Sequence, residues 1–399
     1  VDLRVARIAV RSTSKERHLD LPPEVFTTDA MAVVEDPDID LVVELIGGIE
    51  PARALIRRAI ELGKPVVTGN KELLANHGAE LFAAADAAGV DLLFEAAVAG
   101  GIPLMRPLRE SLVGEPVRRV LGIVNGTTNY ILTRMSEEGV SYADALAEAQ
   151  SLGYAERDPT ADVEGFDAGA KAAIIATIVF GAVVVAGDVY HEGISAVTTD
   201  DIAIAARLGY VVKAVAIVER CDSQPGDPFE VAVRVHPALV PDTHPLATVR
   251  LSFNAVFVEG DAVGELMLFG RGAGGRPTAS AVLGDVIDAA INRVNGSAGR
   301  IGTLAPARIR PIDELSSAYY LGVEVRDQPG VLASVADVFG RHGVSIRSME
   351  QQGLGDQARL IFITHRSVES AVQATLHELR ELDVVNDIHA VLRVVGDED

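Results

Sequence analysis

Charged side chains gather in residues 152–171 (LGYAERDPTADVEGFDAGAK), directly before a long apolar run. Asp167 and Lys171 lie four residues apart, so on a helix they share one face. The run that follows, residues 172–187, is apolar on every face, which is typical of a buried helix. Charges at the start of a buried helix are rare unless they are paired or functional. The stretch is therefore either an active site or an ordinary ion pair worth about 0.3–0.5 kcal/mol.

Two other kinds of chemistry deserve comparison. The acids Asp158, Asp162 and Asp167 could bind a metal ion, but no histidine lies nearby, and hydrogen bonds to the loop backbone are the simpler role. A covalent thioester mechanism needs a cysteine in a catalytic loop. The sole cysteine, Cys221, instead ends a predicted strand before a polar turn. These residues therefore favour acid–base chemistry over metal or thiol chemistry.

Composition restricts the kind of protein. A chain of 399 residues with 48% hydrophobic residues is expected to form two or three well-packed domains. A formal charge of −22 argues against nucleic acid or anionic membranes as partners. The sequence shows no secretory signal and no apolar stretch of the ~20 residues that span a membrane. A single cysteine permits no intramolecular disulfide. We expect a cytoplasmic protein that acts on a small molecule.

The first hundred residues alternate between strands and helices. Strands are predicted at residues 5–10, 41–45, 65–68 and 90–94, and helices at residues 30–34, 52–62 and 71–88. Such alternation is typical of a parallel sheet with helices on its faces, and ligands bind such sheets at the carboxyl ends of the strands.

A dinucleotide-binding unit of this type opens with a strand, a GxGxxG turn and a helix. No such turn precedes the first predicted strand, so we expect that the chain lacks the first strand and its glycine turn. Arg11 and Lys15 follow the first strand present, and basic residues there favour the 2′-phosphate of NADP over NAD. Gly47 and Gly48 follow the next strand and are further candidate cofactor contacts.

The pattern changes after about residue 105. Helices are predicted at residues 129–138 and 142–152, and long alternating strands at residues 211–220, 230–240, 249–259 and 264–269. Strands without intervening helices indicate an α+β domain with a largely antiparallel sheet. The glycine-rich turn at residues 270–275 precedes a helix that starts near Pro277, a weak signal for phosphate binding.

The C-terminal part follows a β-α-β-β-α-β order. Strands are predicted at residues 319–326, 344–351, 359–364 and 391–395, with helices at residues 332–342 and 368–379. This order is the ferredoxin-like pattern.

Four motifs together make the chain resemble homoserine dehydrogenases of the form with a C-terminal ACT domain. They are TGNKELLA at residues 68–75, EAAVAGGIP at 95–103, NGTTNYIL at 125–132 and the stretch at 152–171, and DQPGVLASVADVFGRHGVSI at 327–346 resembles an ACT domain. The resemblance implies a nucleotide-binding domain at 1–104 completed by 271–300, a catalytic and dimerisation domain at 105–270, a linker at 301–317 and an ACT domain at 318–399. It also implies a homodimer or homotetramer.

The resemblance further implies a reaction and its residues. The family interconverts L-homoserine and L-aspartate 4-semialdehyde with NADP or NAD. The resemblance implies the catalytic residues Lys171, Asp167 and Lys71, and the substrate ligands Glu156, Asp162, Asp167 and Tyr154. It implies cofactor contacts at Lys71, at Gly153 and in the turn at Gly272–Gly274. It also implies that a monovalent cation, usually sodium, is bound largely through the backbone carbonyls of Glu95, Val98, Gly100 and Ile102.

The chemistry agrees with these roles. Hydride leaves a carbinol carbon only as its hydroxyl proton is removed, so a base must lie within hydrogen-bond reach of that oxygen. Burial or a second cation such as Lys71 favours the neutral form of Lys171, whereas Asp167 favours the charged form, and the sequence leaves the balance open. The substrate's α-ammonium explains the acids of the loop, and the NGTTNY segment could supply donors to its α-carboxylate.

Two further expectations concern regulation and an alternative identity. An amino acid such as threonine is expected to bind near residues 327–330, so that deletion after about Tyr319 leaves catalysis and abolishes inhibition. Without its glycine turn, the chain could alternatively be an amino-acid-sensing or structural remnant that holds no cofactor.

Overall fold

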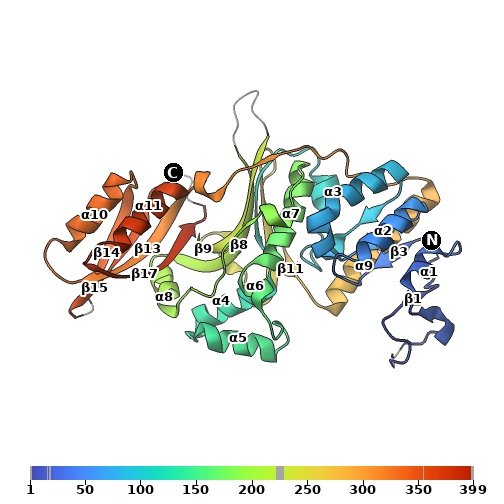
Figure 1. Ribbon diagram of the computed structural model, residues 1–399, viewed down its shortest axis with the longest axis horizontal. Helices are drawn as coiled ribbons and strands as arrows, with labels where there is room; N and C mark the ends of the chain where they lie inside the picture. The colour runs from blue at the N-terminus through green and yellow to red at the C-terminus, as the bar shows by residue number, and fades with distance from the viewer. Residues whose placement is uncertain (1, 16, 18, 222–228, 354, 397–399) are drawn as a thin grey trace. The chain divides into compact units, whose positions relative to one another are not determined.

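The computed structural model describes residues 2–15, 17, 19–221, 229–353 and 355–396. Its internal contacts divide the chain into two compact units (Figure 1). The first comprises Val1–Glu115, Ala173–Gly187 and Arg271–Ala307, and the second comprises Pro116–Ala172, Asp188–Gly270 and Arg308–Asp399.

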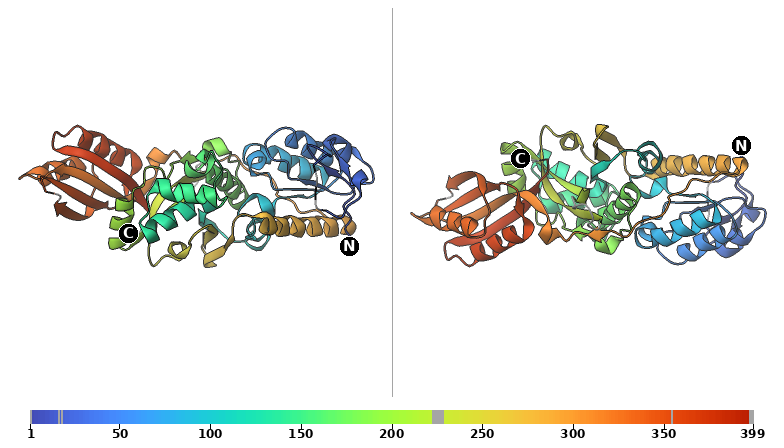
Figure 2. Two further views of the ribbon diagram at one scale, coloured as in Figure 1. Left: turned by 90° about the horizontal axis from the view of Figure 1, so that it is seen from below. Right: turned by 90° about the horizontal axis from the view of Figure 1, so that it is seen from above.

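The first unit is built from short parallel strands covered by helices. β1 (Ile8–Ala9) pairs with β2 (Phe26–Thr27), and β3 (Val42–Glu44), β4 (Val66–Thr68) and β5 (Leu92–Leu93) form a separate parallel sheet. Its helices are α1 (Ala30–Glu35), α2 (Ala52–Glu61), α3 (Lys71–Ala88) and α9 (Gly275–Asn295). α9 lies on one side of the three-stranded sheet, and α2 and α3 lie on the other (Figure 2). The predicted parallel α/β class is confirmed.

Helix boundaries in this unit follow the local sequence. The Asn70 side chain accepts a hydrogen bond from the Leu73 amide at the start of α3, and Gly89 ends that helix at a φ of 67°. The predicted apolar helix at residues 172–187 is partly wrong, because α7 (Phe166–Phe180) ends before Gly181, whose φ is 61°. Beyond this glycine Ala182 forms an isolated bridge with Ala305.

The second unit contains one extended sheet. Its main strand order is β11-β10-β6-β8-β9-β17-β13-β15-β14. The strands are β6 (Val117–Ile123), β8 (Tyr210–Cys221), β9 (Glu230–Pro241), β10 (Phe253–Gly260), β11 (Gly264–Arg271), β13 (Ser316–Arg326), β14 (Ile346–Gly353), β15 (Gln357–Thr364) and β17 (Val385–Val394). The sequence-based prediction missed β6, in which Arg118 and Arg119 interrupt the apolar alternation, and it began β10 at residue 249 rather than 253.

The last four strands combine with α10 (Val331–Arg341) and α11 (Glu369–Arg380), which confirms the ferredoxin-like order. The two helices enclose a core with Tyr319, Val335 and Leu376 on one face of the strands. The predicted linker at residues 301–317 also contains structure, because β12 (Arg308–Ile309) pairs with β9.

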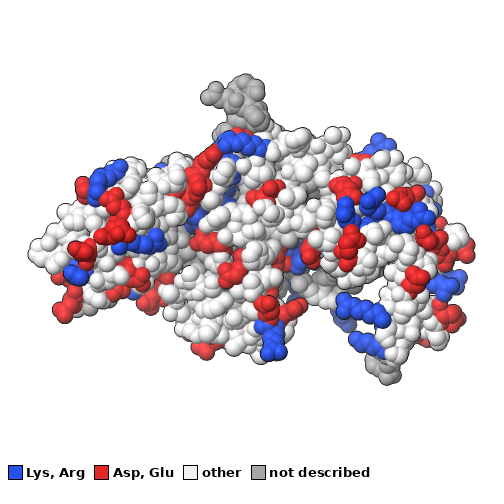
Figure 3. Space-filling model, in the orientation of Figure 1, with Lys and Arg blue, Asp and Glu red and all other residues white. Residues whose placement is uncertain are grey.

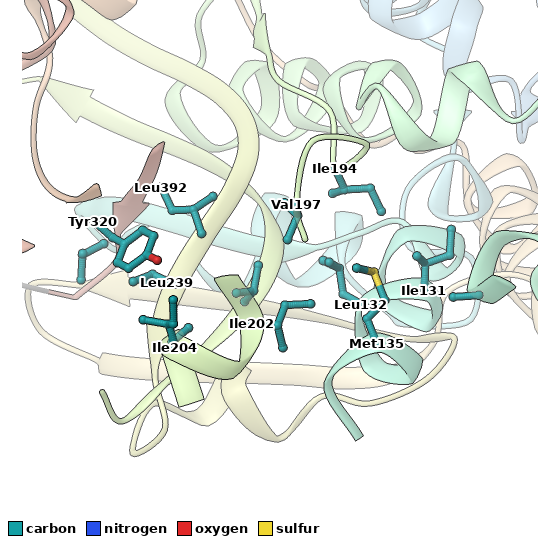
Figure 4. Packing of buried hydrophobic residues seen from close by; sticks show 14 of the residues in the cluster. Ile131, Leu132, Met135, Ile194, Val197, Ile202, Ile204, Leu239, Tyr320 and Leu392 are labelled. Atoms are coloured by element: carbon teal, nitrogen blue, oxygen red, sulfur yellow. The ribbon is translucent and has the colours of Figure 1, made fainter. Parts of the chain in front are cut away.

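The other face of these strands shares a core with the helices α4 (Gly126–Glu138), α5 (Tyr142–Ser151) and α8 (Thr199–Arg207). Figure 4 shows this cluster with Ile131 and Met135 of α4, Ile202 of α8, Tyr320 of β13 and Leu392 of β17. β17 also pairs in parallel with β9. The C-terminal strands are therefore continuous with the rest of the sheet in both hydrogen bonding and packing.

Candidate active site

Lys171 is held by two acceptors at the start of α7. Its Nζ donates to Asp167 Oδ2 at 2.7 Å and to the Val124 carbonyl at 2.6 Å. Lys171 and Asp167 are only 9% and 8% exposed. The Val124 carbonyl is available because β6 ends one residue earlier, at Ile123. The predicted pair is therefore confirmed as a contact, and the end of a sheet strand fixes where the ammonium points.

Asn125 connects this pair to a second acid. Its side-chain oxygen caps α4 by accepting from the Thr128 amide at 2.9 Å. Its Nδ2 donates to Asp162 Oδ1 at 2.7 Å and to Asp167 Oδ2 at 2.9 Å. One buried amide thus starts a helix and ties two carboxylates together. The sequence-based prediction placed the NGTTNY motif near the substrate but did not name Asn125, although an asparagine before a helix is a recognisable cap.

The cluster formed by Asn125, Asp162, Asp167 and Lys171 contains two carboxylates and one ammonium. Asp162 lies on the single-turn helix α6 (Thr160–Val163) and is half-buried. The N-terminal end of α4, where the peptide dipoles concentrate positive charge, lies beside the acids and stabilises them. The arrangement can bind a cationic group at the acids and can exchange a proton at Lys171 Nζ.

The rest of the predicted substrate loop is exposed. The ring of Tyr154 lies 5.0 Å from that of Tyr130, and its carbonyl accepts from Thr127 Oγ1 at 2.7 Å. Glu156 is exposed, and no hydrogen bond joins its carboxylate to the Asn125 cluster in the described part of the chain. Gly153 supports the turn with a φ of 75°. The structure therefore brings Asp162 and Asp167 together but leaves Glu156 facing solvent.

In the first unit, a buried carboxylate joins the ends of two parallel strands. Glu44 at the end of β3 accepts from the amides of Ile46 and Gly47 at 2.7 and 3.2 Å. It also accepts from the Thr68 hydroxyl, at the end of β4, at 2.7 Å. Gly47 and Gly48 follow with φ values of 80° and 75°, and a Cβ added at either would meet nothing within 4 Å. This open backbone lies where parallel sheets bind dinucleotides.

Lys71 is the first residue of α3 and lies beside this glycine loop. Asn70, the residue before it, donates from Nδ2 to the Gly48 carbonyl at 2.7 Å. Lys71 is half-buried, whereas Arg11 and Lys15 are exposed shortly after β1. The three basic residues thus belong to the first unit, and Lys171 belongs to the second.

A second glycine contact lies in the same unit, at the start of α9. A Cβ at Gly100 would meet the Gly272 carbonyl oxygen at 2.2 Å, and one at Gly101 would meet Pro277 at 2.7 Å. Gly274 precedes α9 with a φ of 120°. The two turns approach so closely that only glycine fits, and the first residues of α9 are exposed.

Glu95 holds the predicted cation turn from inside. Its carboxylate accepts from the backbone amides of Leu104, Met105 and Arg106, the last two at 2.8 and 2.9 Å. Its own amide donates to Asp285, and burial raises the pKa of that carboxyl to about 6. Because the Glu95 carboxylate already accepts from three backbone amides, a cation at this turn would be held by backbone carbonyls.

The competing chemistries find no support. Cys221 is buried at the end of β8, and burial raises the pKa of its thiol to about 11, so the thiolate that a covalent mechanism needs is disfavoured. In the described part of the chain, no group of three or more His, Cys, Asp and Glu residues is placed to hold a metal ion.

Three family models match the chain. The model described as homoserine dehydrogenase matches residues 103–287, the homoserine dehydrogenase NAD binding domain matches residues 1–95, and the ACT domain matches residues 319–384.

Several known proteins are similar over nearly the whole chain. Homoserine dehydrogenase of Corynebacterium glutamicum is 50% identical over 396 residues, covering 99% of this chain and 88% of that protein. That of Mycobacterium tuberculosis is also 50% identical, covering 98% and 89%. The crystal structure of a homoserine dehydrogenase from Thiobacillus denitrificans superposes with a TM-score of 0.90 at 41% identity, covering 98% and 90%. A hyperthermophilic archaeal homoserine dehydrogenase mutant in complex with NADPH gives 0.57 at 33% identity, covering 66% and 75%.

Proposed function

The chain belongs to the homoserine dehydrogenase family and is an oxidoreductase with a nucleotide-binding domain, and from this premise we propose that Lys171 is its proton donor and acceptor. The observation that carries the proposal is the buried Lys171 Nζ held at 2.7 Å from Asp167 and at 2.6 Å from the Val124 carbonyl. These contacts leave the ammonium in one orientation beside the acids that suit an amino-acid substrate.

Each residue of the cluster has a separate task. In the reducing direction, the Lys171 ammonium donates a proton to the aldehyde oxygen, and in the oxidising direction its neutral amine takes the hydroxyl proton. Bound nicotinamide cofactor supplies or accepts the hydride. Asp167 and the Val124 carbonyl hold Nζ in position throughout. Asp162, with Glu156 from the exposed loop, binds the α-ammonium of the substrate, and the first amides of α4 bind its α-carboxylate.

The first unit supplies the cofactor contacts. We assign the nicotinamide dinucleotide to the open loop at Gly47 and Gly48, with Lys71 beside it, and to the Gly274 turn. The exposed Arg11 and Lys15 favour NADP over NAD because they can pair with a 2′-phosphate. The archaeal relative described with NADPH supports this preference.

The monovalent cation and the effector complete the proposal. Ala99 and Gly100 have φ values of 57° and 48°, a curled turn that suits carbonyl coordination of sodium by Glu95, Val98, Gly100 and Ile102. An amino acid such as threonine binds near Asp327 to Gly330, where the chain turns into α10, and regulates the pathway enzyme by feedback. A homodimer or homotetramer remains the proposed assembly.

The experiment that tests the role of Lys171 is its replacement by alanine. We expect turnover of homoserine to fall at least ~100-fold, the low end for loss of a general acid or base. Lys213→Met is the matched control, because Lys213 is another buried lysine of the same unit that donates to the Val249 carbonyl and to Asn129, away from Asp167. A near-normal rate in Lys171→Ala would move the role to Lys71.

A further inference from the structure

A buried arginine of the C-terminal domain binds two carboxylates from different parts of the second unit. Arg393 of β17 donates to both carboxylate oxygens of Glu369, at the start of α11, at 2.8 Å each. Its third donor, Nη1, lies 2.7 Å from Glu192, which belongs to the catalytic part of the chain. Arg393 is 4% exposed, and its guanidinium also lies 5.4 Å from the ring of Tyr190. One side chain thus fixes the segment around Glu192 to the ACT domain.

The segment that contains Glu192 is itself attached to the central sheet. β7 (Tyr190–His191) pairs in parallel with β9, and the Glu192 amide donates to the Val235 carbonyl at 2.8 Å. Two residues later the Ile194 amide donates to the Val163 carbonyl at 2.9 Å. The segment therefore runs from the sheet to the loop that leads into α7.

The same segment presses on the start of α7. A Cβ at Gly169 would lie 2.0 Å from His191 Nε2, so the imidazole packs directly on the helix backbone. The ring of Phe166, one turn earlier, lies 5.1 Å from that of His191. A Cβ at Gly193 would lie 2.3 Å from the Glu164 carboxylate. Glycines at 169 and 193 permit this close contact.

Gly169 lies on the side of α7 opposite the reacting residues. Asp167 and Lys171 are each two residues away from it, which is about 200° around a helix of 3.6 residues per turn. The contact at Gly169 therefore supports α7 from the side opposite Asp167 and Lys171. Since a 1 Å misplacement of a catalytic group can cost ~100-fold in rate, support on this side matters for turnover.

We propose that His191 and Glu192 are positioning residues for the Asp167–Lys171 pair, and that Arg393 of the ACT domain holds them against α7. The inference rests on the proposed function of Lys171. It gives the ACT domain a direct physical route to the catalytic helix: from Glu369 through Arg393 to Glu192, and from the neighbouring His191 to Gly169.

The charges around Arg393 allow the proposal to be tested with a substitution that leaves no buried charge unpaired. Arg393 faces two carboxylates, of which Glu369 is buried and Glu192 is half-buried. In Glu192→Gln, Arg393 keeps its two-oxygen contact with Glu369, so no buried charge is left unpaired. Replacement of Glu369 or Arg393 would leave a buried charge unpaired. A loss of activity could then come from lower stability rather than from misplaced catalytic residues.

The first experiment compares Glu192→Gln with Glu148→Gln in the full chain. Glu148 of α5 pairs with Arg134 of α4 at 2.7 Å and is exposed to a similar degree as Glu192, and Arg134 keeps its contact with Glu138 when Glu148 is replaced. We expect Glu192→Gln to lower kcat at least ~5-fold with KM for homoserine within about twofold, because orientation rather than binding is disturbed. Glu148→Gln should leave kcat near wild type. Equal loss in both variants, or no loss in Glu192→Gln, would overturn the proposal.

The second experiment uses the contact between His191 and Gly169. Gly169→Ala should slow turnover because the new methyl group collides with the imidazole. His191→Ala alone should also slow turnover, because it removes the support of α7. The double variant should be no slower than His191→Ala alone, because the missing imidazole vacates the space that the methyl group needs. If the loss of rate in the double variant equals the combined losses of the two single variants, the two residues are not coupled and the proposal fails.

Hydrogen exchange separates this proposal from the proposed function. Amides of residues 163–171 should exchange faster in Glu192→Gln than in the wild-type chain, whether or not homoserine is turned over. Unchanged exchange in this segment would count against positioning. An inactive wild-type chain with the expected change in exchange would instead reject the proposed function alone.

Discussion

Asn125 shows how one side chain can organise a site that contains no metal ligand cluster in the described part of the chain. Its amide donates to Asp162 and Asp167, and its oxygen caps α4. Without the amide, both carboxylates would lose a buried donor, and repulsion between them would be less well offset. The geometry of Lys171 thus depends on a neutral neighbour as much as on its ion partner.

Replacement of Asn125 by alanine tests this dependence. Hydrogen bonds to charged groups contribute about 1.5–3 kcal/mol, so we expect a loss of ~10- to 150-fold in kcat/KM. Ser141→Ala is the control, because Ser141 caps α5 through the Asp144 amide without touching either acid. It should lose only the stability of a helix cap, about 0.5–2 kcal/mol. Similar catalytic losses in both variants would show that Asn125 acts through the fold alone.

Asp285 makes the stability of the first unit depend on pH, which can be tested. Burial raises the pKa of its carboxyl to about 6 from an ordinary value of 3.8. The folded state therefore binds this proton more tightly than the unfolded state, and the stability it contributes is present below about pH 4 and is lost as pH rises through 6. Asp285→Asn cannot ionise. Its melting temperature should rise relative to wild type between pH 4 and 7; a constant difference would contradict the assignment.

At the scale of elements, the ACT domain is joined to the catalytic sheet more closely than its sequence suggested. β17 pairs with β9 through Arg393 and Val394, and Tyr320 and Leu392 share a core with α4 and α8. Deletion after about Tyr319 was expected to leave catalysis intact. The structure instead predicts that the deletion removes a neighbouring strand from β9 and exposes Leu239 of the shared core.

We therefore expect the truncated chain to be less soluble and to melt well below the full chain. The lost packing includes several fully buried side chains, each worth about 1.5–3 kcal/mol. Thermal unfolding of both chains, followed by light scattering and far-ultraviolet dichroism, measures this difference. A truncated chain that melts like the full protein and keeps its kcat would show that the shared core contributes little.

A point substitution is the better test of the effector site. Asp327→Ala changes an exposed residue before α10 and leaves the shared core in place. If an amino acid binds near residues 327–330, inhibition by threonine should weaken at least ~10-fold, the effect of losing about 1.4 kcal/mol of binding, with uninhibited kcat unchanged. The matched control is Asp337→Ala, an exposed acid within α10 that pairs with Arg341. Unaltered inhibition in both variants would place the effector elsewhere.

Local signals explain which elements could be predicted. Capped helices such as α3, between Asn70 and Gly89, and the βαββαβ order were predicted from the sequence. The short helix α8 was missed, although Thr198 and Asp201 form a capping box at its start. Asn125 was missed because its acids lie 37 and 42 residues later in the chain. The contact of His191 with Gly169 depends on tertiary packing and gives no periodic pattern in the sequence.

At the scale of the whole molecule, charge and function are consistent. A net charge of −22 leaves any anionic ligand to be held by local basic groups, a role that we propose for Arg11, Lys15 and Lys71. On the face drawn in Figure 3, acidic and basic side chains are interspersed. No helix in the described ranges is both long and apolar enough to cross a membrane. Small anionic cofactors and amino acids therefore fit this surface better than extended polyanions do.

We propose that this chain oxidises homoserine at the cluster of two carboxylates and one lysine. The most direct measurement is the homoserine-dependent reduction of NADP, followed by the absorbance of the reduced nicotinamide, with aspartate 4-semialdehyde trapped as the product. We expect steady turnover that requires both substrates and stops in Lys171→Ala. A folded wild-type chain that binds the cofactor yet forms no semialdehyde from homoserine would contradict it.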